Sequence, residues 1–160
     1  MRPAQHPTAV RLSQRLRESG VDAQVVEFER PTRTSADAAA AIGCTVAEIA
    51  KSVVFRGKAS GAAMVVVASG ANRVSEEKVA AIVGESLARA DAEFVREATG
   101  YVIGGVAPIG HAKPVKLLLD DDLQRFQTVW AAGGTPHSVF PLTPAELRTA
   151  TGADWSDVKA

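Results

Sequence analysis

The chain has 160 residues, 46% of them hydrophobic, and its 18 lysines and arginines balance its 18 aspartates and glutamates. This length and apolar content suit one globular domain with a substantial core and exclude a disordered chain. The zero net charge excludes a protein that coats DNA through a broad basic surface. With no apolar leader and no apolar run long enough to span a bilayer, we expect a soluble, cytoplasmic protein.

The first half of the chain predicts three helices and three strands. The apolar spacing of residues 8–19 indicates an amphipathic helix that ends at Gly20. Two runs rich in valine, at 52–56 and 62–68, are separated by a glycine-containing turn and predict a hairpin. The other elements expected here are a strand over 24–28, a helix from an N-cap at Ser35 to Ile42, a capping box at 45–48 and a helix over 75–83.

The second half predicts two more helices among several strands. Asp91 is a typical N-cap for a helix over 92–99, and Thr143 begins a capping box for a helix to about Thr151. The expected strands are 101–103, 115–119, 128–132, 138–140 and 155–158. Hairpins and clustered late strands favour a mixed, largely antiparallel sheet. The fold class is therefore α/β, with residues 1–160 forming a single domain.

Lys51 is the first candidate functional residue. It directly precedes the apolar run Val53-Val54-Phe55, and strand alternation places its side chain on the same face as Val53 and Phe55. A lysine at the edge of a buried face is costly unless it extends its ammonium to water or meets a negative partner. It is therefore either a structural lysine or a cation kept for an anionic ligand or a developing oxyanion.

Two glycine-containing segments are the next candidates. Residues 104–111 contain three glycines and a proline, a composition that lets the main chain approach a ligand and present N–H groups to it. Residues 133–138 place His137 after a tight glycine turn. Each segment alone is also compatible with a structural turn, and His137 with a half-buried structural histidine.

A metal site is not expected. The three histidines are far apart in the sequence, there is one cysteine, and no zinc-binding spacing is present. Asp120, Asp121 and Asp122 form the one acidic run with the composition of a cation site. An acidic first turn for the segment 123–126 explains this run more simply.

The order of these segments resembles the YbaK/prolyl-tRNA synthetase-associated domain family. The similarity is carried by residues 34–39, 49–55, 99–110 and 133–134 and extends over nearly the whole chain, from about residue 8 to 158. It implies an α/β fold around a mixed, barrel-like sheet of about six or seven strands surrounded by helices. Because no synthetase catalytic segment is present, we expect a free-standing member.

The resemblance implies trans-editing, the hydrolysis of the ester that joins a wrong amino acid to the 3′ end of a tRNA. Lys51 matches the essential lysine of the family, and Gly104 and Pro108 match the ends of its Gly-x-x-x-Pro loop. We assign catalysis to Lys51, Gly104, Gly105 and Val106, with backbone N–H groups near Gly105 and Val106 stabilising the oxyanion. No cofactor and no metal are expected, and Lys51 is not assigned as a covalent nucleophile.

The amino acid expected on the tRNA is small. The family branch that acts on cysteinyl-tRNA carries a tyrosine near Phe28, an aromatic residue near Thr34 and a different sequence after Gly134. These departures favour alanine or 2-aminobutyrate over cysteine. The residues expected to line the substrate pocket are Phe28, Thr34, Ser35, Met64, Val66, Pro108 and His137.

Several alternatives remain open from sequence alone. They are a deacylase for Cys-tRNA(Pro), a non-catalytic module that binds tRNA, another nucleic acid or a synthetase, and a hydrolase of small esters or amides. The aromatic content of 5% counts against a stacking platform for single strands. The expected partners are the acceptor end of an aminoacyl-tRNA and an aminoacyl-tRNA synthetase, with no membrane and no specific DNA.

Overall fold

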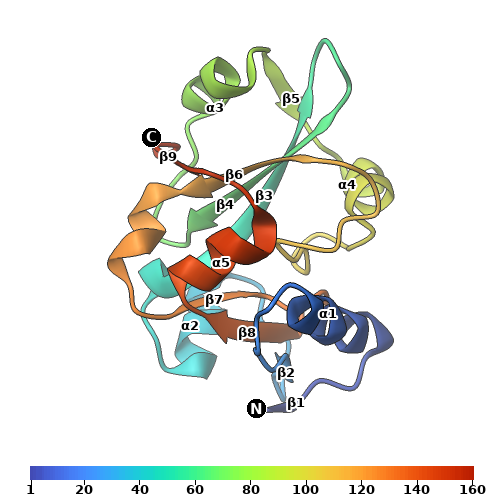
Figure 1. The fold of residues 1–160 in the computed structure, drawn as a ribbon, viewed down its shortest axis with the longest axis vertical. Coiled ribbons are helices and arrows are strands. Elements are labelled where there is room, and N and C mark those ends of the chain that lie inside the picture. Colours follow the sequence, from blue (N-terminus) through green and yellow to red (C-terminus); the bar gives the residue numbers. More distant parts are fainter.

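The computed structural model describes residues 1–160 as one mixed sheet with helices packed around it (Figure 1). The helices are α1 (Pro7–Glu18), α2 (Ser35–Ile42), α3 (Glu76–Val83), α4 (Ala92–Thr99) and α5 (Pro144–Thr151), with 3-10 turns η1 (Val46–Glu48) and η2 (Asp121–Arg125). The strands are β1 (Arg2–Pro3), β2 (Val26–Glu27), β3 (Ile49–Gly57), β4 (Ala63–Ser69), β5 (Leu87–Arg89), β6 (Lys116–Asp120), β7 (Val129–Ala132), β8 (Ser138–Leu142) and β9 (Trp155–Ser156).

Side-chain caps set the starts of all five α-helices, and those of α4 at Asp91 and α5 at Thr143 are the ones that the sequence predicts, whereas the His6 cap of α1 was not predicted. In each case the residue before the helix accepts a hydrogen bond from a first-turn N–H, which would otherwise lack a partner. One cap differs from the prediction. Thr34, not Ser35, caps α2, because Thr34 is extended and its hydroxyl accepts from the Asp37 N–H at 3.0 Å, while Ser35 is already helical.

The sheet has the order β1-β2-β8-β7-β3-β4-β6-β9, with β5 beside β3. Five of its eight pairings are antiparallel and three are parallel. The expected α/β class with a mixed, largely antiparallel sheet is therefore confirmed. There are nine strands instead of six or seven, and β1 and β5 are only two and three residues long, too short to show a periodic pattern.

One predicted strand is wrong. Residues 101–103 form no strand pairing and begin an irregular loop that continues to residue 115. The Tyr101 hydroxyl donates to the Ile109 carbonyl at 2.8 Å and so ties the two limbs of this loop together. Apolar residues beside glycine suggested a strand, but Tyr101 is buried by packing against the core instead of by pairing in the sheet.

Three apolar clusters hold the helices against the sheet. The largest includes Leu12 and Leu16 of α1, Leu147 of α5 and Phe140 of β8. A second joins α3 to one face of the β3–β4 hairpin, and a third packs α2 against Ile49 and its neighbours. Figure 1 shows α1 and α2 at the β7–β8 end of the molecule and α3 near the hairpin end. None of these helices combines the length and the apolar character needed to cross a bilayer.

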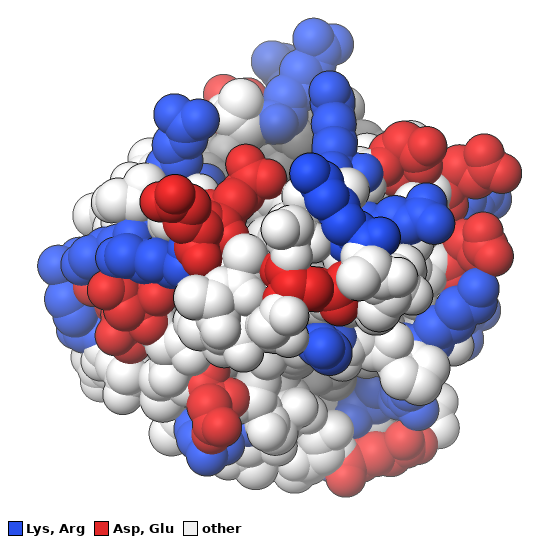
Figure 2. All heavy atoms as spheres, turned by 90° about the horizontal axis from the view of Figure 1, so that it is seen from above, with Lys and Arg blue, Asp and Glu red and all other residues white.

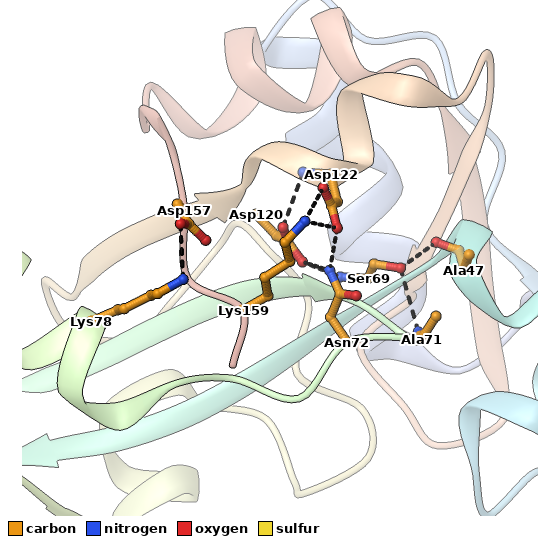
Figure 3. A network of polar contacts seen from close by, with 9 residues as sticks. All are labelled: Ala47, Ser69, Ala71, Asn72, Lys78, Asp120, Asp122, Asp157 and Lys159. Atoms are coloured by element: carbon orange, nitrogen blue, oxygen red, sulfur yellow. Dashed lines mark hydrogen bonds and ion pairs between the residues drawn. The ribbon is translucent and has the colours of Figure 1, made fainter.

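A buried polar network joins β4, β6 and the C-terminal segment (Figure 3). Asp120 is fully buried and accepts hydrogen bonds from the Ser69 N–H, the Asn72 amide and the Asp122 N–H, at 2.8–3.0 Å. Asp122 in turn binds Asn72 and the Lys159 ammonium. Asp120 also caps η2, so the acidic run is the first turn of this 3-10 helix, as expected.

Replacement of Asp120 by alanine should lower the free energy of unfolding by about 3 kcal/mol. The substitution leaves the buried Ser69 N–H and the Asn72 amide without an acceptor and removes the cap of η2. Urea unfolding of both proteins measures the difference. Asp154→Ala, which removes only a largely exposed ion pair with Arg148, is the matched control and should cost less than about 1 kcal/mol. Equal losses in the two variants would contradict the structural role of Asp120.

The Asp122–Lys159 ion pair should make stability depend on acid pH. Hydrogen bonds from Asn72 and Lys159 hold the pKa of Asp122 below its ordinary value of 3.8. The folded state therefore binds this proton more weakly than the unfolded chain does. The resulting stability is fully present above pH 3.8 and is lost as the pH falls through the lowered pKa. Urea midpoints at pH 7 and pH 3 should differ less for Asp122→Asn than for the unmodified protein.

Candidate functional site

A cavity of about 160 Å³ opens between β3, the start of α2, the loop at 104–106 and the turn at 133–138. Its walls combine apolar side chains with hydroxyls and two cations and include no aspartate or glutamate. The lining residues are Thr32, Arg33, Thr34, Ser35, Ala38, Ile49, Ala50, Lys51, Ser52, Gly104, Val106, Trp130, Ala132, Pro136, Ser138 and Val139.

The cavity exists because the sheet opens at this point. Strand β7 pairs with β3 only at Ile49 and Ala50, and β5 pairs with the same edge only from Phe55 onward. Residues 51–54 of β3 therefore have no strand partner on this side. The glycine loop and the turn after β7 lie beside the opening instead of a continuing strand.

Lys51 contributes a half-buried cation to this cavity. Its cross-strand partner on β4 is Ala68, and Val53 and Phe55 follow it on the same face, as strand alternation predicts. The Lys51 ammonium forms no ion pair and no hydrogen bond with another part of the chain. A cation held without a protein partner at the wall of a cavity is available to a negatively charged or strongly polar ligand.

Two residues of the 104–106 loop, Gly104 and Val106, line the cavity and carry main-chain donors. Gly104 has a φ of +88°, which favours glycine, and the N–H groups of Gly104 and Val106 donate to no acceptor in the protein. The Gly105 N–H, in contrast, donates to the Val102 carbonyl at 2.9 Å. Of the donors expected near Gly105 and Val106, only that of Val106, a residue 4% exposed, is unpaired.

Gly105 has no side chain, and this lets the loop pack closely against the turn at 133–138. A Cβ atom at Gly105 would lie 2.7–3.0 Å from the main chain of Thr135, so the two segments pack backbone to backbone. The turn that receives Gly105 is itself closed by hydrogen bonds from the Gly133 N–H to the Ser138 carbonyl and between the Thr135 and Ser138 hydroxyls. Gly105 therefore holds its two neighbours against the cavity and does not itself line it.

The structure brings together five of the predicted site residues and places the other six elsewhere. Lys51, Gly104, Val106, Thr34 and Ser35 line the cavity. The residues that do not are Phe28, Met64, Val66, Gly105, Pro108 and His137. Sequence reasoning missed the other eleven lining residues, among them Arg33, Ser52, Trp130, Ala132 and Pro136. Ser52 and Arg33 adjoin predicted residues, but the contribution of Trp130 and Ala132 depends on where β7 diverges from β3.

Each residue outside the cavity has a clear position. Met64 and Val66 lie on the same face of the hairpin as Lys51 but farther along it, where they pack in the α3 cluster. Phe28 packs in the α2 cluster, which backs the cavity. Pro108 lines a separate hollow near Leu117, because the loop turns away after Val106. His137 is exposed, and its carbonyl accepts from the Phe28 N–H at 2.7 Å.

Possible metal ligands do not gather at the cavity. The one close group of three such side chains is Asp120, Asp121 and Asp122, and none of them lines the cavity. Asp120 and Asp122 are already bound to Asn72, and Asp122 also to Lys159. Cys44 is partly buried outside the cavity, and burial raises the pKa of its thiol, as does the nearby Glu48 carboxylate.

An opened sheet, a lysine without a protein partner and main-chain donors without acceptors therefore bound one cavity. The aminoacyl-tRNA editing domain family matches residues 29–150, a range that contains Lys51, the glycine loop and the turn at 133–138. The chain belongs to this family, and its resemblance to the YbaK/prolyl-tRNA synthetase-associated domains is confirmed.

Several relatives are similar over most of the chain. A crystal structure of a candidate trans-editing enzyme for prolyl tRNA synthetase is 44% identical, with a TM-score of 0.91, covering 98% of this chain and 99% of the other. The hypothetical protein APE2540 is 31% identical, with a TM-score of 0.86, covering 93% and 99%. The uncharacterized protein YwhH of Bacillus subtilis (strain 168) is 39% identical over 123 residues, or 77% of this chain and 78% of YwhH.

Proposed function

We propose that this chain is a trans-editing deacylase that hydrolyses mischarged aminoacyl-tRNA carrying a small amino acid, with alanine or 2-aminobutyrate favoured over cysteine. The observation that carries the proposal is that one cavity is lined both by Lys51, whose ammonium has no partner, and by Val106, whose N–H has no acceptor. At about 160 Å³ this cavity is smaller than the surface hollows elsewhere on the molecule, which measure about 460–660 Å³.

The proposed mechanism follows from the negative charge that develops on the ester during hydrolysis. Attack on the ester carbonyl places negative charge on its oxygen, and N–H groups held in advance stabilise that charge without reorganisation. We assign this role to Val106 and Gly104. Lys51 orients the phosphate or the hydroxyls of the terminal adenosine. Water attacks the ester carbonyl, the bond to the ribose oxygen breaks, and the free amino acid and the tRNA 3′ hydroxyl are released. The reaction then proceeds by positioning and electrostatics, without a metal and without an acyl intermediate on a side chain.

The apolar side chains that line the cavity select a small acyl group. Ala38, Ile49 and Val139 close the apolar side of the cavity. One methylene in such a pocket changes discrimination by only about 1–3 kcal/mol, so the selectivity is graded. That behaviour suits a second sieve, which removes small amino acids that a synthetase has wrongly attached.

The proposed partner is the acceptor end of the tRNA, bound locally in the cytoplasm, with an aminoacyl-tRNA synthetase as a further partner. The net charge of zero gives no broad attraction to nucleic acid. Figure 2 shows acidic and basic side chains interspersed over the face that it displays. A few contacts near the ester therefore have to supply the binding, and the affinity should be modest and sensitive to salt.

A panel of charged tRNAs tests the proposal. The purified chain should release alanine and 2-aminobutyrate from tRNA(Pro) faster than cysteine, and correctly charged Pro-tRNA(Pro) should remain intact. Activity should be unchanged by EDTA. Intact esters throughout the panel, with tight binding of uncharged tRNA, would favour a non-catalytic module. Faster release of cysteine would overturn the assigned amino acid but keep the reaction.

A further inference from the structure

The Ser52 hydroxyl is the one buried side-chain polar atom in the chain that has no hydrogen-bond partner. Buried hydroxyls are almost always paired, because an unpaired one loses its bonds to water and gains nothing in return. Ser52 also lines the cavity. An unpaired polar atom at this place indicates a group that a bound ligand satisfies.

Ser52 lies on the other face of β3 from Lys51. Alternation places Lys51 with Ile49 on the α2 side, and Ser52 with Ala50 on the side of the main core, where Val106 packs. The register supports this, because Ser52 pairs with Val67, another residue of the main core. The cavity therefore has a cationic end at Lys51 and a second polar end at Ser52, on the side of the Val106 main chain.

The charged side chains of the cavity indicate which group of a ligand the Ser52 hydroxyl binds. Arg33 and Lys51 are the charged lining residues, and no carboxylate is present to bind an amine. The amine of an aminoacyl ester therefore needs a neutral acceptor. The Ser138 and Thr34 hydroxyls already bond to Thr135 and to the Asp37 N–H. Thr32 and Ser35 also carry hydroxyls in the lining, but neither hydroxyl is buried without a partner. The Ser52 hydroxyl is buried and free to accept.

We propose that the Ser52 hydroxyl accepts a hydrogen bond from the α-amine of the bound aminoacyl group, and so distinguishes aminoacyl esters from acyl esters that lack the amine. This inference rests on the proposed deacylation and adds a specificity residue to it. A site built to bond an N–H group discriminates strongly against an analogue without one, because its own polar atom is then left unpaired.

The assignment is tested by changing the enzyme at Ser52 and, separately, the substrate at its α-amine. Alanyl-tRNA and propionyl-tRNA differ by the amine alone, and each is given to the unmodified protein and to Ser52→Ala. The variant should lose at least about 10-fold in kcat/KM on alanyl-tRNA and less than about 2-fold on propionyl-tRNA. Ser52→Thr, which keeps a hydroxyl, should retain more of the preference for the amine than Ser52→Ala does.

The thermal stability of Ser52→Ala distinguishes a role in substrate specificity from a structural role of Ser52. Because Ser52→Ala removes an unpaired buried group, its Tm should equal or exceed that of the unmodified protein. A second measurement needs no variant: the unmodified protein should bind 3′-alanylamido-adenosine at least about 10-fold more tightly than 3′-propionamido-adenosine. Equal losses on both tRNAs, or equal binding of both analogues, would overturn the assignment while leaving the deacylase intact. An unmodified protein that cleaves no aminoacyl-tRNA would instead remove the proposed function, and this inference with it.

A different observation concerns helix α1, on the other side of the turn at 133–138. Arg11 and Arg15 stand one helical turn apart and line a hollow of about 460 Å³ together with Tyr101. Neither arginine forms an ion pair, and Glu18 is the one acidic residue of the lining. Arg11 donates one long hydrogen bond, of 3.4 Å, to the Thr8 hydroxyl, so both guanidinium groups keep donors for the oxygens of a phosphate, which arginine binds in a planar, bidentate geometry.

This hollow adjoins the cavity. A Cβ atom at Gly134 would lie 3.0 Å from Thr8 of α1 and 3.4 Å from the Tyr101 ring, so the turn packs against the hollow. Pro136 and Ser138 of the same turn line the cavity. We propose that Arg11 and Arg15 bind backbone phosphates of the acceptor strand whose terminal ester occupies the cavity. This second inference also rests on the proposed deacylation.

The proposed phosphate site at Arg11 and Arg15 is tested by comparing intact alanyl-tRNA with the much smaller alanyl ester of adenosine. Arg11→Ala/Arg15→Ala should lose at least about 10-fold in kcat/KM, through KM, on intact alanyl-tRNA, and nothing on the alanyl ester of adenosine. Its plot of log kcat/KM against log salt should be shallower by roughly 1.4, since each contact to a single strand contributes about 0.7. Arg17→Ala, an exposed arginine on the same helix outside the hollow, is the matched control and should leave both substrates unaffected.

The outcomes are distinct. Equal losses on both substrates would show a structural effect, and no loss on intact tRNA would place the strand elsewhere, so either result overturns the arginine site. An unmodified protein inactive on both substrates would contradict the deacylase itself and the arginine site with it.

Discussion

Lys51→Ala should reduce kcat/KM for alanyl-tRNA by about 10²–10³-fold or more while leaving the fold intact. Lys51 is the lysine of the cavity, its ammonium has no partner in the protein, and its strand neighbours hold it at the wall. Loss of one group that positions or stabilises developing charge costs this much in comparable enzymes. Single-turnover hydrolysis at saturating enzyme measures the chemical step, and the circular dichroism spectrum and Tm show whether the fold is retained.

The matched control is Lys58→Ala. Lys58 is an exposed lysine at the far end of the same strand pair, in the turn between β3 and β4. Its removal changes the net charge by the same amount but leaves the cavity unchanged, so hydrolysis should stay within about 2-fold of the unmodified rate. A Lys51→Ala protein that still hydrolyses alanyl-tRNA at the full rate would contradict the proposed mechanism.

Gly105→Ala should also reduce deacylation by about 10²-fold, through the main chain. The added methyl group would lie 2.7–3.0 Å from the Thr135 backbone, a separation that neither segment can accept without moving. The loop would be pushed away from the turn, and the unpaired Val106 N–H with it. A displacement of about 1 Å in a positioned group can cost this much in rate. Steady-state kinetics with alanyl-tRNA measures the loss.

Gly84→Ala is the control that distinguishes the effect of backbone strain from the effect of displacing the 104–106 loop. Gly84 ends α3 with a φ of +83°, and a Cβ atom there meets nothing within 4 Å. The control should lose about 1 kcal/mol of stability, because alanine is strained at positive φ, yet keep its activity. If Gly105→Ala loses stability to the same extent and keeps its activity as well, the proposed role of the Val106 N–H is wrong.

Local elements were largely predictable from the sequence, because their signals are local. Apolar spacing ending at a glycine identified α1, caps and acidic first turns identified the other four α-helices, and the valine runs identified the β3–β4 hairpin. Two of the main errors share one cause: β5 formed beside β3, and 101–103 packed without pairing, because tertiary contacts outweighed local preference. The cap of α2 was misplaced by one residue for a local reason, since the extended Thr34 accepts from the Asp37 N–H.

The sequence alone also identified the family and pointed to Lys51 and the glycine loop, since a lysine before a buried strand and a glycine-dense loop are locally unusual. The composition of the cavity was decided by the tertiary structure. Ser52 lines it because β7 stops pairing with β3 at Ala50, whereas Met64, on the same face as Lys51, is covered by the α3 cluster. Strand register and helix packing join residues far apart in the chain, so no short segment carries that information.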